Sequence, residues 1–204
     1  MCGRYTLRAS NKPDLAHLIQ DIPDRYNIAP TADVLVETDL AEFTVMSWSF
    51  SPAWAKTPMN LFNARAETLT EKPSFKGAQR CILFADGWYE WQRTVSPSRP
   101  WYHHCGGELL RFAGVYEPTS GCAIVTMGAQ PKIANIHHRQ PLLLSADTSD
   151  RWLDGAPAGD CMTDITVDFH RVSSAVNNAK ADDPRLAHPL DESISGPEQG
   201  ALFY

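Results

Sequence analysis

The second residue, Cys2, becomes a double nucleophile if the initiator Met1 is removed. It would then carry a free α-amine and a thiol on adjacent carbons, whereas the backbone nitrogen of an internal cysteine is acylated. Ordinary pKa values of about 7.7 to 8 for an α-amine and about 8.5 for a thiol leave a usable fraction of both groups deprotonated at neutral pH. An aldehyde is the matching electrophile, because the amine can form a Schiff base and the thiolate can then close a thiazolidine ring on the same carbon. The alternative is that Cys2 is merely a small second residue.

A lone carboxylate, Glu90, lies among large aromatic residues after an Asp-Gly dipeptide that we expect to form a turn between two strands. Alternation along the second strand places Trp88 and Glu90 on one face, and Tyr89 and Trp91 on the other. Burying a charge is expensive unless it is paired or functional, and burial raises the pKa of a carboxyl group. We therefore interpret Glu90 as a general acid or base.

Polar and small residues alternate in a further segment that contains Asn63, Arg65 and Glu67. If this segment is extended, the three side chains share one face and converge on one surface. The alternative is an exposed edge strand with an Arg–Glu ion pair, which would contribute little to stability.

A histidine, His137, precedes the apolar run 142–144, which we expect to be a buried strand. A histidine at the mouth of such a strand is suited to proton transfer, although a structural histidine is the alternative. Metal binding is not expected at His103 and His104, because adjacent strand residues point to opposite faces. The five cysteines form no C-x-x-C pair, which argues against a disulfide framework and a structural zinc site. We expect no cofactor.

Three aromatic residues lie beside Pro52 in the segment WSFSPAW, which begins at Trp48 and ends at Trp54. Aromatic side chains usually belong to the core. The turn-rich context favours partial exposure of at least one of them, and an exposed aromatic residue can stack on a nucleic-acid base.

The composition favours a single soluble domain without a strongly basic surface. The chain has 204 residues, of which 43% are hydrophobic, enough for one well-buried core. Residues 1–100 hold 11 Lys and Arg against 11 Asp and Glu, so the net charge of −6 comes from the second half. Binding to DNA would therefore need a local groove with a few arginines and stacking aromatics. No stretch approaches the roughly 20 apolar residues of a membrane span, and we expect a cytoplasmic monomer.

The elements that must position these residues are mostly short strands. The patterns predict a helix that begins at Ser10 or Asn11 and includes Leu15, Leu18 and Ile19, an ordered loop over 24–31, and a capped helix over 145–153. We expect one domain over 1–190 and a loose tail over 191–204. The predicted strands cover residues 34–37, 43–48, 101–105, 109–116, 122–126 and 163–168.

Linked motifs along the chain together resemble the SRAP family, the SOS-response-associated peptidase or abasic-site processing proteins. The resemblance runs from Cys2 to about Pro189, and it depends on the order of the motifs rather than on any one of them. The motifs are MCGR, YNIAPT, NARAET, DGWYEW, FAG, IHxRxP and VSxxVN. The resemblance implies a compact, β-rich α+β domain with a curved, barrel-like sheet and short helices.

The resemblance also implies a function, namely covalent capture of abasic sites in single-stranded DNA during the DNA damage response. Cys2 would form the imine through its amine and close the ring through its thiolate. Asn63 would position the linkage, Glu90 would move protons, and His137 would help to open the deoxyribose. Bound to DNA, the protein would be associated with the nucleoid.

The same resemblance suggests which residues contact DNA, and the chain also departs from the family pattern at two positions. The likeliest phosphate partners are Arg4 and Arg65, whereas other residues would line the path of the strand. Beside the expected catalytic histidine, His138 and Gln140 depart from the usual family residues. The residues expected along the strand's path are Pro30, Trp48 and Trp54.

Two other functions remain open on the sequence. A cysteine peptidase or N-terminal-nucleophile amidase would use the Cys2 thiol with His137 and Glu90, and it could remove Met1 itself. A non-covalent single-strand binder would not need Cys2.

Overall fold

The computed structural model of the protein describes residues 2–15, 17 and 22–190, which form two mainly antiparallel sheets. The predicted tail over 191–204 lies outside the described residues. The smaller sheet has five strands in the order β13 (Asp168–Arg171), β8 (Arg99–His104), β7 (Gly87–Gln92), β1 (Tyr5–Leu7) and β2 (Arg25–Ile28).

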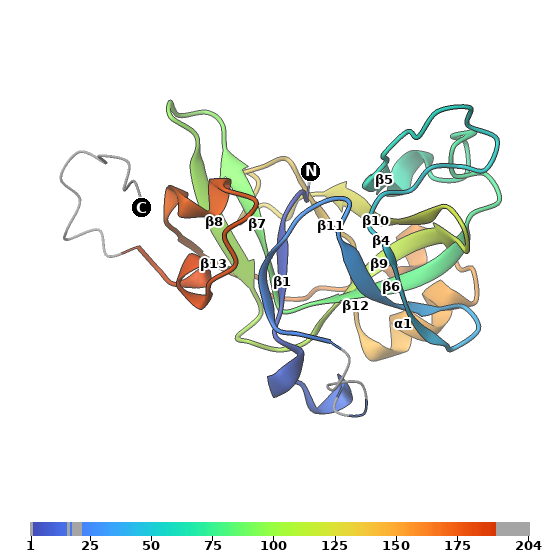
Figure 1. Ribbon diagram of the computed structural model, residues 1–204, viewed down its shortest axis with the longest axis horizontal. Helices are drawn as coiled ribbons and strands as arrows, with labels where there is room; N and C mark the ends of the chain where they lie inside the picture. Colours follow the sequence, from blue (N-terminus) through green and yellow to red (C-terminus); the bar gives the residue numbers. More distant parts are fainter. Residues whose placement is uncertain (1, 16, 18–21, 191–204) are drawn as a thin grey trace.

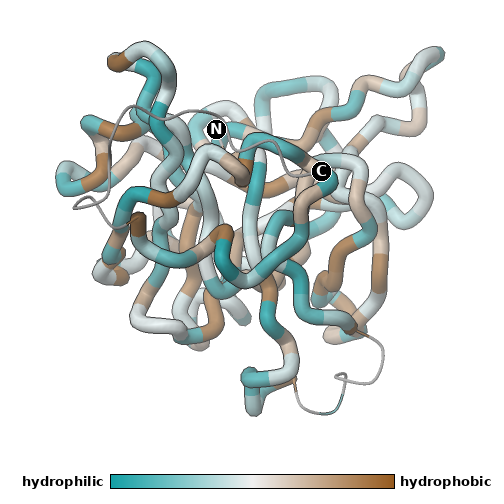
Figure 2. Tube along the Cα trace, turned by 60° about the vertical axis from the view of Figure 1, so that its left-hand side comes forward, coloured by the Kyte–Doolittle hydropathy of each residue, from teal (hydrophilic) through white to brown (hydrophobic). Residues whose placement is uncertain are grey.

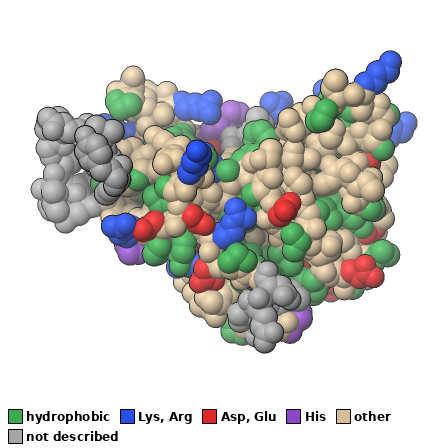
Figure 3. All heavy atoms as spheres, in the orientation of Figure 1, with side chains coloured by type: hydrophobic (Ala, Val, Ile, Leu, Met, Phe, Trp, Pro, Cys, Tyr) green, Lys and Arg blue, Asp and Glu red, His purple; other side chains and the backbone are tan. Residues whose placement is uncertain are grey.

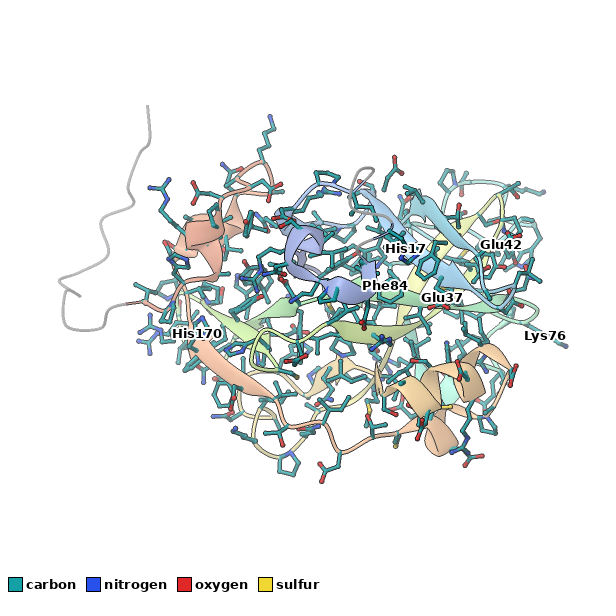
Figure 4. All side chains as sticks on the ribbon, turned by 90° about the horizontal axis from the view of Figure 1, so that it is seen from below. His17, Glu37, Glu42, Lys76, Phe84 and His170 are labelled. Carbon is teal, nitrogen blue, oxygen red and sulfur yellow. The ribbon has the colours of Figure 1, made fainter. Side chains whose placement is uncertain are left out.

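The larger sheet has eight strands. Its main path is β11 (Arg139–Pro141), β10 (Gly121–Gly128), β9 (Leu110–Glu117), β6 (Gln79–Ala85), β3 (Asp33–Thr38) and β4 (Phe43–Ser47). In addition, β12 (Leu143–Leu144) pairs with β9, and β5 (Asn63–Arg65) runs parallel to β10. The two sheets curve without closing into a barrel (Figure 1), and the predicted α+β class is confirmed. The two sheets occupy opposite ends of the molecule, with His170 of β13 at one end and Lys76 at the other (Figure 4).

The predicted turn at Asp86 and Gly87 connects the two sheets instead of closing a hairpin. β6 belongs to the larger sheet and β7 to the smaller one. Asp86 is fully buried, and it accepts hydrogen bonds from the Thr6 hydroxyl and the Arg8 guanidinium. A Cβ atom at Gly87 would lie 2.2 Å from the ring of Tyr102, so glycine is needed at this crossover.

Helices are few among the described residues. The one α-helix, α1 (Ala146–Leu153), confirms the predicted capped helix, and its cap is a capping box formed by Ser145 and Thr148. Its Trp152 indole donates to the carbonyls of Cys81 and Gly114 at 3.0 and 3.2 Å, which fixes the helix on the larger sheet. Further short helical segments are 3₁₀ turns: η1 (Ala9–Asn11), η3 (Ala66–Thr68), η4 (Ala158–Cys161), η5 (Ser174–Asn177) and η6 (Pro184–Ala187).

Three predicted elements differ from the structure. In place of the predicted first helix, 3₁₀ turns occur at η1 and at residues 13–15, and the predicted positions Leu18 and Ile19 lie outside the described residues. The segment predicted as a loop over 24–31 contains strand β2, which pairs with β1 although its side chains show no clear alternation. The strand predicted over 163–168 begins only at Asp168.

Two hydrophobic clusters lie on the two faces of β7, as the alternation predicted. Trp88 packs in the larger cluster together with Cys2. Tyr89 packs on the other face with Tyr102 and Val172. Hydrophobic stretches along the chain are short and alternate with hydrophilic ones (Figure 2), and no helix of the described residues is long and apolar enough to cross a membrane.

Candidate active site

Cys2 is completely buried at the start of the chain, directly before β1. The carbonyl of Arg4 accepts a hydrogen bond from the Tyr89 amide at 2.9 Å, which places the N-terminal segment against β7. Tyr5 anchors the same segment by packing edge-on against Trp48, with 5.1 Å between ring centroids. Burial, and next the charge of Glu90, raise the pKa of the Cys2 thiol well above its ordinary value. In this structure Cys2 is therefore a neutral thiol.

Asn63 reaches Cys2 from the larger sheet. It begins β5, where pairing with Ile124 of β10 fixes its position. Its Nδ2 atom donates to the Cys2 carbonyl at 2.7 Å. Within the described part of the chain, its Oδ1 atom is buried and has no hydrogen-bond partner. Asn63 thus holds the Cys2 backbone with one end and offers a hydrogen-bond acceptor with the other.

Glu90 reaches the same place from the smaller sheet. Only 3% of the residue is exposed, and burial raises the pKa of its carboxyl group to about 7. The increase that the aromatic surroundings predicted is therefore confirmed. A carboxyl group with this pKa is present in both protonation states at neutral pH, so it can both donate and accept a proton.

His137 completes the group from the segment before β11. Its Nδ1 atom lies 3.8 Å from Oε2 of Glu90 and 3.1 Å from the backbone nitrogen of Arg139. Its ring stacks on His138, with 4.6 Å between centroids. Burial lowers the pKa of His137 to about 4, so the imidazole is neutral at pH 7 and its contact with Glu90 is not an ion pair.

The four residues predicted to be catalytic therefore lie together, although they come from four separate segments. Asn63 contacts Cys2, Glu90 acts electrostatically on the Cys2 thiol, and His137 lies beside Glu90. In Figure 3 a histidine lies at the upper edge of the molecule, near the position marked N in Figure 1, with Lys or Arg side chains on both sides of it.

The alternation predicted from Asn63 to Glu67 holds only as far as Arg65. The strand ends there, and η3 turns Glu67 toward Arg139 rather than toward Arg65. Arg139 is 9% exposed and was assigned no role from the sequence. Its place in the IHHRQP segment gave no signal of burial, because its partner lies 72 residues earlier.

The residues predicted to contact DNA differ in their accessibility. Trp48 is fully buried, and its indole donates to the Phe62 carbonyl at 2.8 Å, so it is a core residue and offers no surface to a DNA strand. Trp54 is 62% exposed, and Arg65 is exposed as well. Arg4 is partly buried, and its Nη1 atom donates to Asn27 at 2.9 Å and to the Val176 carbonyl at 3.0 Å.

An open hollow of about 620 Å³ lies beside Trp54. Its lining includes Pro52, Ala53 and Ala55 around the tryptophan, and Thr31 next to Pro30. None of the four residues predicted to be catalytic lines it. Its walls are formed by small and hydroxyl-bearing residues: Thr31, Ser47, Ser49, Ser51, Pro52, Ala53, Ala55, Pro58, Asn60, Thr119, Ser120 and Gly121.

Comparison with known proteins gives consistent matches. The family model described as SOS response associated peptidase (SRAP) matches residues 1–179. Abasic site processing protein YedK of Escherichia coli is 30% identical, over 93% of this chain and 100% of that protein. Abasic site processing protein YoqW of Bacillus subtilis is 31% identical, over 91% of this chain and 98% of that protein. Abasic site processing protein HMCES of Gallus gallus is 29% identical, over 73% of this chain and 58% of that protein.

Solved structures share the fold. A protein from Bacteroides thetaiotaomicron superposes with a TM-score of 0.77 at 19% identity, covering 93% of this chain and all of the other. A phage-related protein from Bordetella bronchiseptica gives a TM-score of 0.67 at 24% identity, covering 85% of this chain and 95% of the other. At these identities the likeness extends to the fold alone.

Proposed function

The chain belongs to the SOS response associated peptidase (SRAP) family, and on this premise we propose that it captures abasic sites in single-stranded DNA covalently through Cys2. Relatives that match over nearly their whole length are named abasic site processing proteins. The observation that carries the proposal is the convergence of Asn63 and Glu90 on Cys2. Removal of Met1 is a precondition, because only a free α-amine can form the imine.

The proposed reaction begins with the amine. It attacks the aldehyde carbon of the ring-opened sugar to give a carbinolamine, and loss of water then gives the imine. The raised pKa of the buried thiol supports this order, because little thiolate is present to attack first. Protonated Glu90 donates a proton to the departing hydroxyl, a role that suits its pKa of about 7.

Ring closure follows on the same carbon. The sulfur adds to the imine carbon, the thiol proton passes to Glu90, and the imine nitrogen receives a proton as the C=N bond becomes a single bond. The product is a thiazolidine, and one water is released in total. The thiol is therefore ionised as it reacts, and the carboxylate is its proton acceptor.

Asn63 and His137 have positioning and hydrogen-bonding roles in this proposal. The unoccupied acceptor Oδ1 of Asn63 suits a sugar hydroxyl. The low pKa of His137 keeps its imidazole neutral at neutral pH. We therefore assign it a hydrogen bond to the ring oxygen as the deoxyribose opens, and not the donation of a full positive charge.

The DNA strand is proposed to run along the accessible residues beside the hollow. Trp54 offers an aromatic face for stacking, and Pro30 directly precedes Thr31, which lines the hollow. Arg65 follows Asn63 by two residues and is exposed for a phosphate contact. Arg4 uses Nη1 to donate to Asn27 and Val176, and the other N–H groups of its guanidinium are proposed to donate to a phosphate.

The proposal is tested by a denaturing gel with intact mass after incubation with single-stranded DNA that carries one abasic site. We expect a heat-stable adduct with the processed protein, and none with Cys2→Ala or with a form that retains Met1. Cys105→Ala is the matched control, because it removes a cysteine outside the site. DNA whose abasic aldehyde has been reduced with borohydride should give no adduct. A heat-stable adduct in Cys2→Ala would overturn the mechanism.

Peptidase activity is the second candidate, and the grouping of Cys2, His137 and Glu90 is the observation that favours it. A peptidase thiol is normally activated by a lowered pKa beside a protonated histidine. Here the thiol pKa is raised and His137 is neutral, which favours the cross-linking reaction. Cleavage of an unrelated peptide by a protein with an extra residue before Cys2 would favour the peptidase, because that protein lacks the free amine at Cys2.

A further inference from the structure

Arg139, a buried residue that the proposed chemistry does not use, forms a two-pronged ion pair with Glu67. Nη1 donates to Oε1 at 2.6 Å, and Nη2 donates to Oε2 at 2.9 Å. The Arg139 side chain is 10% exposed, whereas that of Glu67 is 53% exposed. The hydrogen bond from Arg139 lowers the pKa of Glu67. Parallel contacts of this kind fix geometry as well as charge, because the planar guanidinium matches the carboxylate.

The same guanidinium is also tied to the centre of the larger sheet. Nη2 of Arg139 donates to the backbone carbonyl of Thr126 in β10 at 2.5 Å. Thr126 pairs with Arg65 of β5 and with Pro141 of β11. The Arg139 side chain therefore joins β11 to β10 and to η3, the turn that directly follows β5.

The Glu67–Arg139 pair connects the two segments that carry Asn63 and His137. Glu67 follows Asn63 by four residues, and Arg139 follows His137 by two. The Arg139 amide donates to Nδ1 of His137 at 3.1 Å. The Arg139 carbonyl oxygen also lies 3.1 Å from Nδ1, so the backbone of Arg139 holds the His137 ring at this nitrogen by its N–H group, its carbonyl group or both.

We propose that Glu67 is a positioning residue for the cross-linking reaction, and that it acts through Arg139 on the place of the His137 ring. This inference rests on the proposed function. Without the carboxylate, the guanidinium loses the charged two-pronged contact and keeps its bonds to Thr126, so the segment from His137 to Arg139 is no longer fixed to η3, the turn after β5. Displacement of a reacting group by about 1 Å can slow a reaction by about 100-fold. Binding of DNA does not weaken, because the change removes a negative charge near a polyanion.

The test is single-turnover cross-linking of abasic single-stranded DNA at a series of protein concentrations. For Glu67→Gln we expect a maximal rate lower by about tenfold or more, an unchanged or lower half-saturating concentration, and the full final yield of adduct. Glu71→Gln is the matched control, because it makes the same charge change at an exposed site four residues away. Glu67→Asp should recover part of the rate. Arg139→Lys should not, because an ammonium cannot form the two-pronged contact.

Two kinetic results would overturn the inference. A lower yield at an unchanged rate would mean that the variant is partly unfolded and that Glu67 is only structural. A higher half-saturating concentration at an unchanged maximal rate would make Glu67 a determinant of DNA binding.

The ring nitrogens of His137 supply a readout that needs no cross-linking. Nitrogen NMR of His137 should give the same chemical shifts in the wild type and in Glu71→Gln, and different shifts in Glu67→Gln, because the ring has moved against its hydrogen-bond partners. Unchanged shifts in Glu67→Gln would contradict the inference. If the wild type forms no adduct, the proposed function fails, and the NMR measurement still decides whether Glu67 positions His137.

Discussion

Burial sets the protonation states of the individual residues in the candidate site. It raises the pKa of Glu90 to about 7 and lowers that of His137 to about 4. At neutral pH the pair therefore consists of a carboxyl group in both states and a neutral imidazole. This inverts the usual order, in which the carboxylate is charged and the histidine titrates near neutrality. In the proposed reaction, proton transfer is therefore the role of Glu90 rather than of His137.

The raised pKa of Glu90 has a consequence for stability. A carboxyl group whose pKa is higher in the folded than in the unfolded state favours folding below the unfolded pKa, and this contribution is lost as pH rises through about 7. We expect Glu90→Gln, which stays neutral, to be more stable than the wild type at pH 8 by up to about 3 kcal/mol, at about 1.4 kcal/mol per pKa unit. Near pH 4 the difference should disappear. Urea unfolding at both pH values measures this, and an equal effect at pH 4 and pH 8 would contradict it.

At the scale of the elements, the crossover from β6 to β7 determines where Glu90 lies. Because the chain changes sheets at Asp86 and Gly87, the strand that carries Glu90 faces the N-terminal segment instead of β6. Asp86 holds the crossover through Thr6 and Arg8, which flank Leu7 of β1. The site therefore depends on a junction that contributes no reacting group.

Gly87→Ala tests this junction. Its Cβ would overlap the Tyr102 ring, whose hydroxyl is itself bound to Thr6 at 2.8 Å. We expect a loss of about 1–3 kcal/mol in the free energy of unfolding, as for other overpacked sites. Gly159→Ala is the control, since nothing lies within 4 Å of its added Cβ. Equal stability of the two variants in chemical denaturation would show that the crossover tolerates the methyl group.

At the scale of the whole molecule, the site lies where the two sheets and the N-terminal segment meet. Asn63 comes from the larger sheet and Glu90 from the smaller one, and both act on Cys2. The arrangement also separates two tryptophans that the sequence grouped together. Trp48 lies in the core between Tyr5 and Phe62, whereas Trp54 lies on the surface beside the hollow.

The two tryptophans should therefore respond differently to replacement by alanine. Trp54→Ala should weaken binding to single-stranded DNA by about 1 kcal/mol or more without changing the midpoint of thermal unfolding. Trp48→Ala should destabilise the fold by about 3–5 kcal/mol, because it leaves a large cavity and removes a bond to the Phe62 carbonyl. Fluorescence anisotropy and thermal unfolding distinguish these effects. Full DNA affinity in Trp54→Ala would remove this residue from the proposed path.

The sequence by itself determined the candidate residues and the local faces on which they lie. The aminothiol chemistry proposed for Cys2 depends on its position in the chain, and the strand period of two places Trp88 and Tyr89 in different clusters. The short helix at Ser145 follows from local capping signals. These inferences hold because chain position, side-chain alternation and helix capping depend only on neighbouring residues.

Only the tertiary structure decided which of these groups meet. The hydrogen bond from Asn63 to Cys2 joins residues 61 positions apart, and the pairing of Glu67 with Arg139 joins residues 72 positions apart. The burial of Trp48 depends equally on distant segments. Local periodicity carries no information about such partners, because sheet order and crossovers are set by the packing of the whole core.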